Sequence, residues 1–253
     1  MVVWNAVRPG SDNQGRPADT IEQTNSRGQG EALIRLRGVV KTYPTAAGPF
    51  EALKGVDLDV HPGEFLAISG KSGAGKTTLI NMITGTDHVT SGQVWVADAC
   101  IHCLDESRLA RWRGRTMGVV YQSFHLIPTL SLLDNILLPV DFRGFFQGRR
   151  SRAFAMELLR QVELQEHAYK LPSQISGGQQ QRVAIARALA NDPPIIVADE
   201  PTGRLDSVTA EVIFDIFQGF TRQGKTVVMV THDRGIVQRA SRCLEIRDGE
   251  VSA

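Results

Sequence analysis

The sequence predicts an α/β protein organised around a mostly parallel β-sheet, and three observations support this fold class. Apolar runs of the kind found in buried parallel strands, such as residues 65–68 and 195–198, alternate with segments of helical periodicity. A glycine-rich stretch at residues 70–78 joins the first of these runs to a helical segment. A long helical stretch at about residues 125–190, broken at Pro139, separates two β-rich halves, and we expect it to form a subdomain of its own.

Local patterning predicts the remaining elements. Residues 50–60 alternate apolar and polar side chains, as half-buried strands do. A helix is expected at residues 210–220, followed by a β-branched strand at residues 226–231. Asp248 and Gly249 form the turn of a hairpin that closes the chain.

Length and charge limit the classes of protein that the chain can be. Its 253 residues, 42% of them hydrophobic, can bury a full core. The net charge of +1 gives no electrostatic footprint for nucleic acid, so we expect no nucleic-acid partner. No apolar run has the ~20 residues that a membrane span needs, and the polar N-terminus lacks a signal-peptide core. We therefore expect a cytoplasmic protein that does not itself insert into the membrane, with a flexible tail at residues 1–30 and one domain at residues 31–253.

Three cysteines occur, Cys100, Cys103 and Cys243, and they do not suggest a secreted disulfide scaffold. Cys100 and Cys103 form a CxxC pair, but no second Cys/His pair at zinc-finger spacing accompanies it. We therefore expect ordinary buried or half-buried thiols at these positions, in preference to a metal or redox site.

The glycine-rich stretch has the spacing and the context of a phosphate-binding loop. Its glycines allow backbone conformations in which successive N–H groups converge on one phosphate chain, while the following helix points the positive end of its dipole at the same anion. Lys76 would reach the β- and γ-phosphates, and the Thr77 hydroxyl would complete a Mg²⁺ shell. The candidate nucleotide-binding residues here are Gly70, Lys71, Ser72, Gly73, Ala74, Gly75, Lys76, Thr77 and Thr78.

Two acidic residues directly follow the apolar run at residues 195–198. Carboxyl ends of strands are where α/β sheets place groups that contact a ligand. Asp199 therefore suits an outer-shell Mg²⁺ contact, and Glu200 could polarise an attacking water. Acidic pairs also cap helices, so the functional interpretation depends on the strand before the pair and on the phosphate loop elsewhere in the chain.

A second possible phosphate cradle occurs at residues 175–182, where a Ser-Gly-Gly turn leads into a strong helix former. The candidate binding residues are Ser176, Gly177, Gly178 and Gln179. Ser-Gly-Gly is also a common helix N-cap. One nucleotide does not need two cradles, but two chains arranged head to tail would each offer the second cradle to the nucleotide of the other.

From about Leu33 to Val251 the chain resembles the ATP-binding subunit of an ABC transporter. The motifs of that family occur in the correct order, which makes the resemblance highly specific. In chain order they are a Walker A loop at residues 70–77, a Q-loop glutamine at Gln122, a signature at residues 175–179, a Walker B strand at residues 195–200, a D-loop at Leu205–Asp206 and a switch histidine at His232.

The resemblance implies an ABC ATPase fold, with a P-loop NTPase core, an antiparallel β subdomain and a helical subdomain. It implies ATP and Mg²⁺ as ligands, a homodimer that closes on two nucleotides, and integral membrane permease subunits as partners at the inner face of the cell membrane. By the same resemblance, Glu200 would activate the water, and His232 and Lys76 would contact the γ-phosphate. Thr77 and Asp199 would hold the metal, and Gln122 would sense Mg²⁺ and water. Tyr43 would stack on adenine, and Asp206 would lie beside the nucleotide.

Within the family, the motif sequences are similar to those of the lipoprotein-releasing, macrolide-efflux and FtsE types. Two outputs stay open, namely export or extraction of a substrate, and an FtsE-like ATPase that transmits force through a membrane partner without transport. The chain departs from the family pattern at Lys71, at Tyr121 and at Arg204, the last of which lies at the expected dimer seam. Phe124 and Leu126 either receive a membrane subunit's cytoplasmic helix or belong to the core of the helical subdomain.

Overall fold

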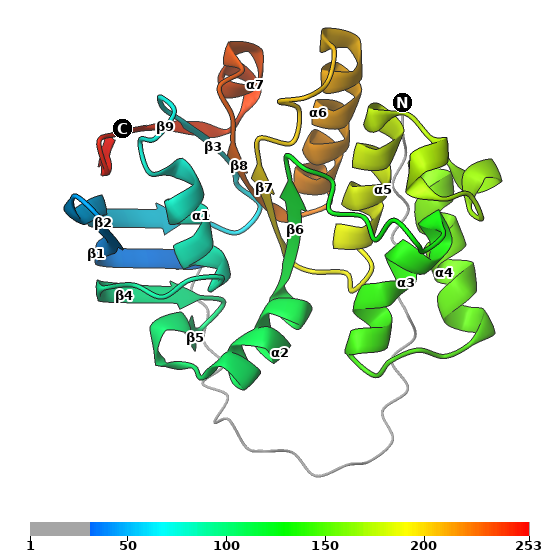
Figure 1. The fold of residues 1–253 in the computed structure, drawn as a ribbon, viewed down its shortest axis with the longest axis horizontal. Helices are drawn as coiled ribbons and strands as arrows, with labels where there is room; N and C mark the ends of the chain where they lie inside the picture. Colours follow the sequence, from blue (N-terminus) through cyan, green and yellow to red (C-terminus); the bar gives the residue numbers. More distant parts are fainter. Residues whose placement is uncertain (1–30, 253) are drawn as a thin grey trace.

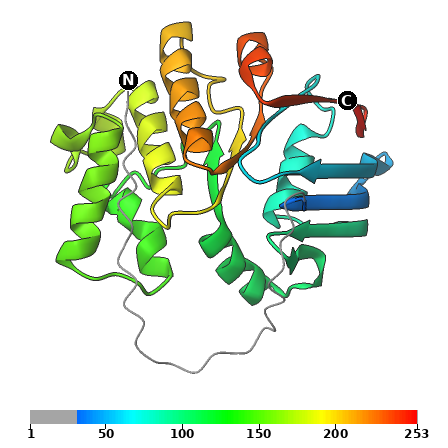
Figure 2. The ribbon, with the colours of Figure 1, turned by 180° about the vertical axis from the view of Figure 1, so that it is seen from behind.

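Two β-sheets and a group of helices make up the fold (Figure 1). The computed structural model describes residues 31–252, so the tail expected at residues 1–30 lies outside the described residues. Figures 1 and 2 show the antiparallel strands on one side of the molecule and helices α3, α4 and α5 on the other, with the parallel sheet between them. This alternation of parallel strands and helices confirms the predicted α/β class.

The smaller sheet is antiparallel and has the strand order β2-β1-β4-β5. Its longest pairing joins β1 to β2, and register shifts interrupt the ladder near Val39 and Thr42. The strands are β1 (Ile34–Thr45), β2 (Gly48–Val60), β4 (Ser91–Val96) and β5 (Ala99–Cys100).

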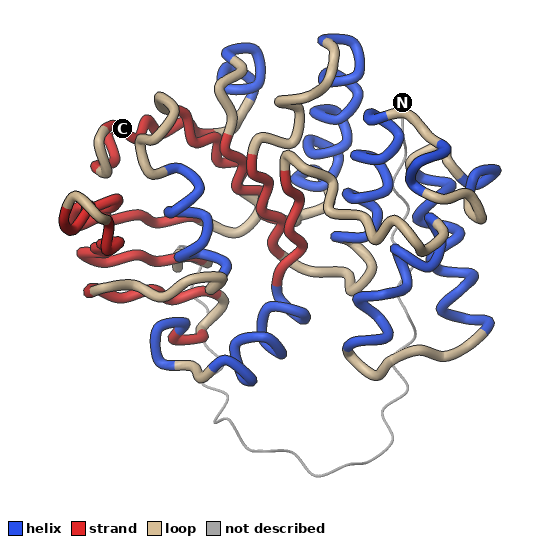
Figure 3. The backbone as a smooth tube through the Cα atoms, viewed as in Figure 1, coloured by secondary structure: helices blue, strands red, loops and turns tan. Residues whose placement is uncertain are grey.

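The larger sheet has the strand order β10-β9-β3-β8-β7-β6 (Figure 3), and all its neighbours are parallel except the β10–β9 pair. The order differs from the sequence order, so the chain crosses over between parallel strands through helices. The strands are β3 (Phe65–Ser69), β6 (Met117–Tyr121), β7 (Ile195–Asp199), β8 (Thr226–Val230), β9 (Arg242–Arg247) and β10 (Glu250–Ser252).

The helices are α1 (Lys76–Thr84), α2 (Glu106–Thr116), α3 (Leu132–Phe142), α4 (Arg149–Gln161), α5 (Gly177–Ala188), α6 (Ser207–Arg222) and α7 (Arg234–Arg239), with short 3₁₀ turns η1 (Ile101–Cys103), η2 (Gln165–His167) and η3 (Pro172–Gln174). The break expected at Pro139 is wrong, because this residue lies inside α3. Proline lacks the N–H that would donate to the carbonyl four residues earlier, that of Asn135, so one intrahelical bond is missing while the helix continues through Phe142.

Buried side chains on the two faces of the parallel sheet belong to two different cores. Along β7, Ile195 and Val197 join the core beneath α1, whereas Ile196 and Ala198 join the core beneath the helical segment. Alternate side chains of a strand point to opposite faces, so a strand covered on both faces must be apolar throughout. This is why the run at residues 195–198 does not alternate and why all four of its side chains are buried.

Cys100 and Cys103 form a disulfide, with Cα atoms 5.4 Å apart. The expectation of two ordinary thiols at these positions is therefore wrong. The CxxC spacing alone does not predict a disulfide, because β5 and the η1 turn set the distance between the two Cα atoms and so decide whether the sulfurs can bond. Cys243 is a free thiol.

Across residues 31–252, none of the helices combines the length and the apolar composition that crossing a bilayer requires.

Candidate functional site

The site lies at the carboxyl edge of the larger sheet. Strands β3, β8, β7 and β6 are consecutive neighbours and parallel, so the residues that follow them meet at one edge. These residues are the glycine-rich loop after β3, His232 after β8, the Asp199–Glu200 pair at the end of β7 and Gln122 after β6. The structure thus brings together four groups that lie far apart in the sequence.

The glycine-rich loop needs glycine at two positions for steric reasons. At Gly70, with φ of +155°, a Cβ atom would lie 2.3 Å from the carbonyl oxygen of Ile246. At Gly75, with φ of +106°, it would lie 2.5 Å from the carbonyl oxygen of Ala52. The loop is therefore pressed against β2 and β9, and any other residue would push its backbone away from the start of α1.

Lys76 begins α1, and its buried side chain turns back over the loop. Its Nζ donates hydrogen bonds to the carbonyl oxygens of Gly70 (2.8 Å) and Lys71 (3.0 Å). It also lies 3.8 Å from Oε1 of Glu200. A buried ammonium must keep polar partners, and these contacts hold its charge at the centre of the loop, where an anion would bind.

Thr77 and Asp199 connect the loop to β7. The Thr77 hydroxyl donates to Oδ2 of Asp199 over 3.0 Å. Burial of Asp199 raises the pKa of its carboxyl, and the charge of Glu200 adds to this, while the Thr77 hydrogen bond and Lys76 oppose it. A hydroxyl and a carboxylate oxygen are hard ligands that suit Mg²⁺, so this donor pair fits the expected metal. A divalent cation here would also relieve the cost of keeping Asp199 ionised.

Glu200 has an unusual backbone conformation, with φ of +46°. Its N–H donates to the carbonyl of Val230 on the neighbouring strand (2.9 Å), which fixes this turn. One carboxylate oxygen faces Lys76, and the other lies 3.2 Å from Nδ1 of His232. Left-handed conformation in a residue other than glycine costs free energy, and here it aims the carboxylate along the edge instead of continuing β7.

Gln122 lies beside Glu200 through a shared neighbour, Gly203. A Cβ atom at Gly203 would be 2.6 Å from Nε2 of Gln122 and 3.4 Å from Oε2 of Glu200. The Gln122 amide and the Glu200 carboxylate therefore both lie against Gly203 in the turn after β7. Gln122 is only partly buried, and it belongs to the segment that leads from β6 into the helices.

The second cradle is an independent helix start. Ser176 caps α5, since its hydroxyl accepts from the N–H of Gln179 (3.3 Å) and its own N–H donates to Oε1 of Gln179 (2.9 Å). Ser176 and Gly177 are exposed. A Cβ atom at Gly178 would lie 2.5 Å from Cγ2 of Thr209, so α5 packs closely on the first turn of α6.

Within one chain the two cradles lie apart. Figures 1 and 2 show α1, which follows the phosphate loop, and α5 on opposite sides of β6 and β7. Asp206, the D-loop candidate, is exposed and caps α6 by accepting hydrogen bonds from Thr209 N (3.0 Å) and Oγ1 (2.6 Å). These bonds lower the pKa of the Asp206 carboxyl. The signature and D-loop residues thus stabilise helix starts on an open surface.

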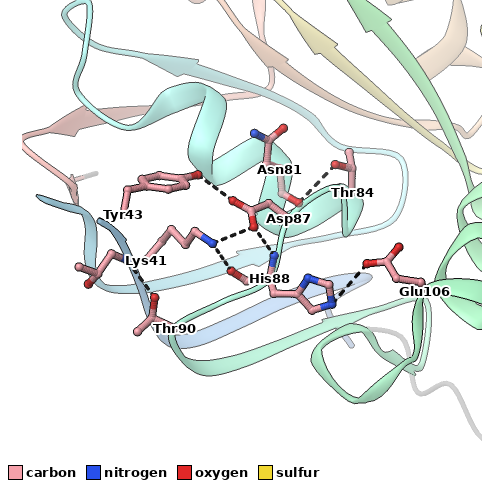
Figure 4. A network of polar contacts seen from close by, with 9 residues as sticks. Lys41, Tyr43, Asn81, Thr84, Asp87, His88, Thr90 and Glu106 are labelled. Carbon is pink, nitrogen blue, oxygen red and sulfur yellow. Dashed lines mark hydrogen bonds and ion pairs between the residues drawn. The ribbon is translucent and has the colours of Figure 1, made fainter. Parts of the chain in front are cut away.

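Tyr43 lies in β1 close to α1, and a polar network that was not predicted holds it there (Figure 4). Its hydroxyl donates to Oδ2 of Asp87 (2.9 Å), and Nζ of Lys41 lies 4.8 Å from its ring centroid. Lys41 also donates to Oδ1 of Asp87 (2.7 Å). Burial would raise the pKa of Asp87, but the hydrogen bonds from Lys41 and Tyr43 outweigh it and lower that pKa. One ring face of Tyr43 therefore has a cation partner, and the role on adenine stays a prediction.

Two departures from the family pattern are exposed at the surface, and the one within the phosphate loop leaves the hydrogen bonds of the loop intact. Lys71 and Arg204 are exposed. The carbonyl of Lys71 still accepts from Lys76, so the extra charge does not disturb the loop. Leu126 packs against the core of the helical segment, which favours the structural alternative for this side chain. Phe124 lies over the start of α5, where its ring would be 3.6 Å from a Cβ atom at Gly177.

Comparison with known proteins identifies the same family. The sequence model of the family described as "ABC transporter" matches residues 53–203. An uncharacterized ABC transporter ATP-binding protein of Methanocaldococcus jannaschii is 46% identical over 223 residues, which cover 87% of this chain and 95% of that protein. The macrolide export ATP-binding/permease protein MacB 1/2 of Paracoccus denitrificans is 42% identical over 224 residues, and the chain spans 33% of the length of that protein.

Solved structures agree with the fold. A dimeric post-hydrolysis state of the ATP-binding cassette MJ0796 bound to ADP and Pi has a TM-score of 0.81 at 43% identity, covering 87% of this chain and 97% of that chain. A second dimeric structure of MJ0796, described as a bacterial ABC transporter cassette, has a TM-score of 0.82 at 45% identity with the same coverage. The ABC ATPase fold expected from the resemblance is confirmed.

Proposed function

Because this chain belongs to the ABC transporter family, we propose that it is an ATP-hydrolysing subunit that powers a separate membrane permease, with export or extraction of a substrate as the output. Two copies would close on two Mg-ATP molecules at the inner face of the cell membrane. The MacB-type relatives, whose name joins an ATP-binding part to a permease, support the pairing with a permease and the outward direction.

The observation that carries the proposal is the edge at which Lys76, Glu200 and His232 converge. The Glu200 carboxylate lies between the ammonium of Lys76 (3.8 Å) and the imidazole of His232 (3.2 Å). A carboxylate between two such groups is held in one orientation, which is what a residue that orients an attacking water requires. Gln122, across Gly203, would place an amide at the same point.

Phosphoryl transfer to water needs positioning and charge stabilisation more than covalent chemistry. Thr77 and Asp199 would hold Mg²⁺, which when bound would neutralise charge on the phosphates. Lys76 and the loop N–H groups would bind the phosphates, Glu200 would orient the water and accept its proton, and His232 would keep Glu200 in place. The helix start at Ser176 in a second copy would supply the missing donors.

The first test is Glu200→Gln in the full chain. We expect ATP turnover to fall roughly 10² to 10⁴-fold, as loss of a general base does, while ATP binding is retained and the dimer is stabilised by Mg-ATP. Phosphate release and light scattering at saturating Mg-ATP measure the two effects. Unchanged turnover would remove Glu200 from this role, and a variant that stays monomeric even with its membrane partner would contradict the dimer.

A groove between α2, β6 and α3 supports the permease partner. Its volume is about 660 Å³, and its lining combines apolar side chains with five arginines and no acidic residue among the described residues that form it. Nε of Arg143 is buried there and has no hydrogen-bond partner among the residues that the structure describes. Burial lowers the pKa of Arg143, and the nearby charge of Arg115 adds to the effect. The arginines are Arg111, Arg113, Arg115, Arg143 and Arg187.

A groove that is basic and apolar at once fits a helix that carries acidic and apolar side chains. We expect such a helix in the cytoplasmic part of the permease. Arg143→Glu should therefore abolish co-purification with the permease and leave the basal ATPase of the isolated chain unchanged. Arg152→Glu, an exposed arginine outside the groove, is the matched control and should co-purify normally. Retained binding by Arg143→Glu would place the permease on another surface.

A further inference from the structure

Outside the nucleotide site, one short segment gathers two sulfurs and an imidazole. Cys100 ends β5, Cys103 ends η1, and His102 lies between them in sequence. The sulfur atoms and a ring nitrogen of His102 all lie within 4.8 Å of one another. We propose that Cys100 and Cys103 are a reversible thiol–disulfide pair, exchanging with small thiols and disulfides, and that His102 is the positioning residue that stabilises the Cys100 thiolate.

The two sulfurs differ in access, which gives the exchange a direction. Cys103 is exposed and Cys100 is only partly exposed. An incoming thiolate therefore reaches the sulfur of Cys103 first, and Cys100 is the leaving group. Exposed disulfides that close short loops are the exchangeable ones, whereas buried structural ones resist reduction. At the cytoplasmic location proposed for this chain, a disulfide would have to be of the transient kind.

His102 is held next to the leaving sulfur by the edge of β4. The N–H of Val94 donates to its Nδ1 over 3.1 Å, and the carbonyl oxygen of Val94 lies at the same distance from Nδ1. Both ring nitrogens lie 3.4 Å from Sγ of Cys100. With Nδ1 accepting from Val94, Nε2 carries the ring proton and can donate to the sulfur, which favours the thiolate over the thiol. The acidic residues that begin α2 are engaged elsewhere, since Asp105 pairs with Arg108 and Glu106 with His88.

The exchange balances as two successive displacements. A thiolate RS⁻ attacks Sγ of Cys103, the bond between Cys103 and Cys100 breaks, and Cys100 leaves as a thiolate beside His102. A second RS⁻ attacks the outer sulfur of the Cys103–S–S–R mixed disulfide, releasing R–S–S–R and the Cys103 thiolate. The net reaction reduces one protein disulfide and oxidises two small thiols to a disulfide, and the reverse uses a small disulfide as the oxidant.

The pair lies at a connection between elements. Ile101, between the two cysteines, is buried, and its side chain approaches Gly85 at the end of α1 together with Leu109 of α2. Asp105, two residues after Cys103, caps α2 by accepting from the N–H of Arg108 (2.8 Å). Opening the disulfide would therefore release a restraint on the start of α2 and leave the sheet edge with Lys76 and Glu200 untouched.

The test uses the full chain with Cys243→Ala, which removes the free thiol outside the pair. The protein is equilibrated in mixtures of reduced and oxidised glutathione, alkylated and weighed intact. We expect two alkyl groups per chain in reducing mixtures and none in oxidising ones, with one reversible transition between them. A pair that stays reduced in every mixture, or stays oxidised in every mixture, would overturn the proposal.

A second arm isolates the role of His102. In Cys103→Ser, Cys243→Ala protein the single thiol is Cys100, and its alkylation rate is measured against pH with and without His102→Asn. We expect His102→Asn to slow alkylation at pH 7 about tenfold and to move the rate profile to higher pH, with an unchanged melting temperature as the fold control. An unmoved profile would remove His102 from this role.

Reduced protein that retains one zinc ion per chain and resists oxidation would show a metal site and refute the redox pair.

Discussion

The phosphate loop and the start of α5 are both glycine-rich helix starts, but they differ in what surrounds them. The loop is enclosed at its two ends, since Gly70 and Gly75 are pressed against neighbouring backbone and Lys76 is buried over it, whereas Lys71, Ser72 and Gly73 between them are exposed. Ser176 and Gly177 at the start of α5 are exposed, and a capping box between Ser176 and Gln179 holds this helix start. The first cradle therefore has Glu200 beside its lysine, whereas the second is a capped helix start at the surface.

In the dimer proposed above, this difference would give the two cradles separate roles. A capping box stabilises a helix start by about 1 kcal/mol without any ligand, so α5 can stay folded and exposed until a phosphate arrives. An isologous pair of chains would place each exposed start against the enclosed loop of the other. The comparison predicts that damage to either cradle alone abolishes turnover, and that the two kinds of damage are distinguishable.

The largest expected effect is recovery of activity on mixing two inactive variants. Lys76→Ala and Ser176→Arg should each abolish ATP turnover when pure. Mixed dimers would contain one composite site with both changes and one with neither, because the two sites of a twofold pair exchange the same parts. We expect an equal mixture to recover up to about a quarter of the wild-type rate, measured as phosphate release. A mixture as inactive as its components would argue that each chain completes its own site.

A smaller effect separates the cradles by nucleotide affinity in the monomer. Lys76→Ala removes an ammonium and its charged hydrogen bonds, so the Kd for ATP should rise roughly 10 to 100-fold. Ser176→Arg should leave this Kd unchanged, because the start of α5 is remote from the loop of its own chain. Equilibrium binding at protein concentrations too low for dimers measures both. Equal losses in the two variants would contradict the division into enclosed and exposed halves.

The smallest expected effect concerns the network that holds Tyr43 beside the enclosed half (Figure 4). The pKa of the Asp87 carboxyl is lower in the folded chain than in the unfolded chain. The Asp87 carboxylate therefore contributes fully to the free energy of unfolding above its unfolded-state pKa, about 4, and this contribution is lost as the pH falls through its folded-state pKa. Asp87→Asn should lower the melting temperature by about 2 to 4 °C at pH 7, and the difference from wild type should vanish on acidification below about pH 4. A difference that grows at low pH would assign the opposite shift to Asp87.

Sequence patterns predicted most of the enclosed half because local spacing dictates it. Glycines before Lys76 and an apolar strand before Asp199 are visible without knowing the fold. Asp87 was missed because its partners, Lys41 and Tyr43, lie more than forty residues earlier and meet it only through the packing of β1 on α1. The groove arginines escaped notice for the same reason, since α2, the residue after α3 and α5 contribute them separately.

Two predictions made from sequence patterns differ from the structure. The Cys100–Cys103 spacing was recognised, but spacing cannot report whether two Cα atoms come within bonding distance. A break in the helical stretch was expected at Pro139, yet α3 continues to Phe142, because the proline removes only the one hydrogen bond to the carbonyl four residues earlier. His232 had no local signal of its own, because a lone histidine after a strand is usually structural; the family resemblance alone predicted it, and in the structure its Nδ1 lies 3.2 Å from Glu200.

The order of β6 and β7 has a mechanical consequence. The chain leaves the larger sheet after Tyr121 at one edge and re-enters it at Ile195 at the opposite edge, because the two neighbouring strands are parallel. The intervening helices are therefore tied to the sheet at both ends and share a core with β6 and β7. Gln122 is the first residue of that connection after β6, so the segment that leads to the start of α5 begins beside Glu200.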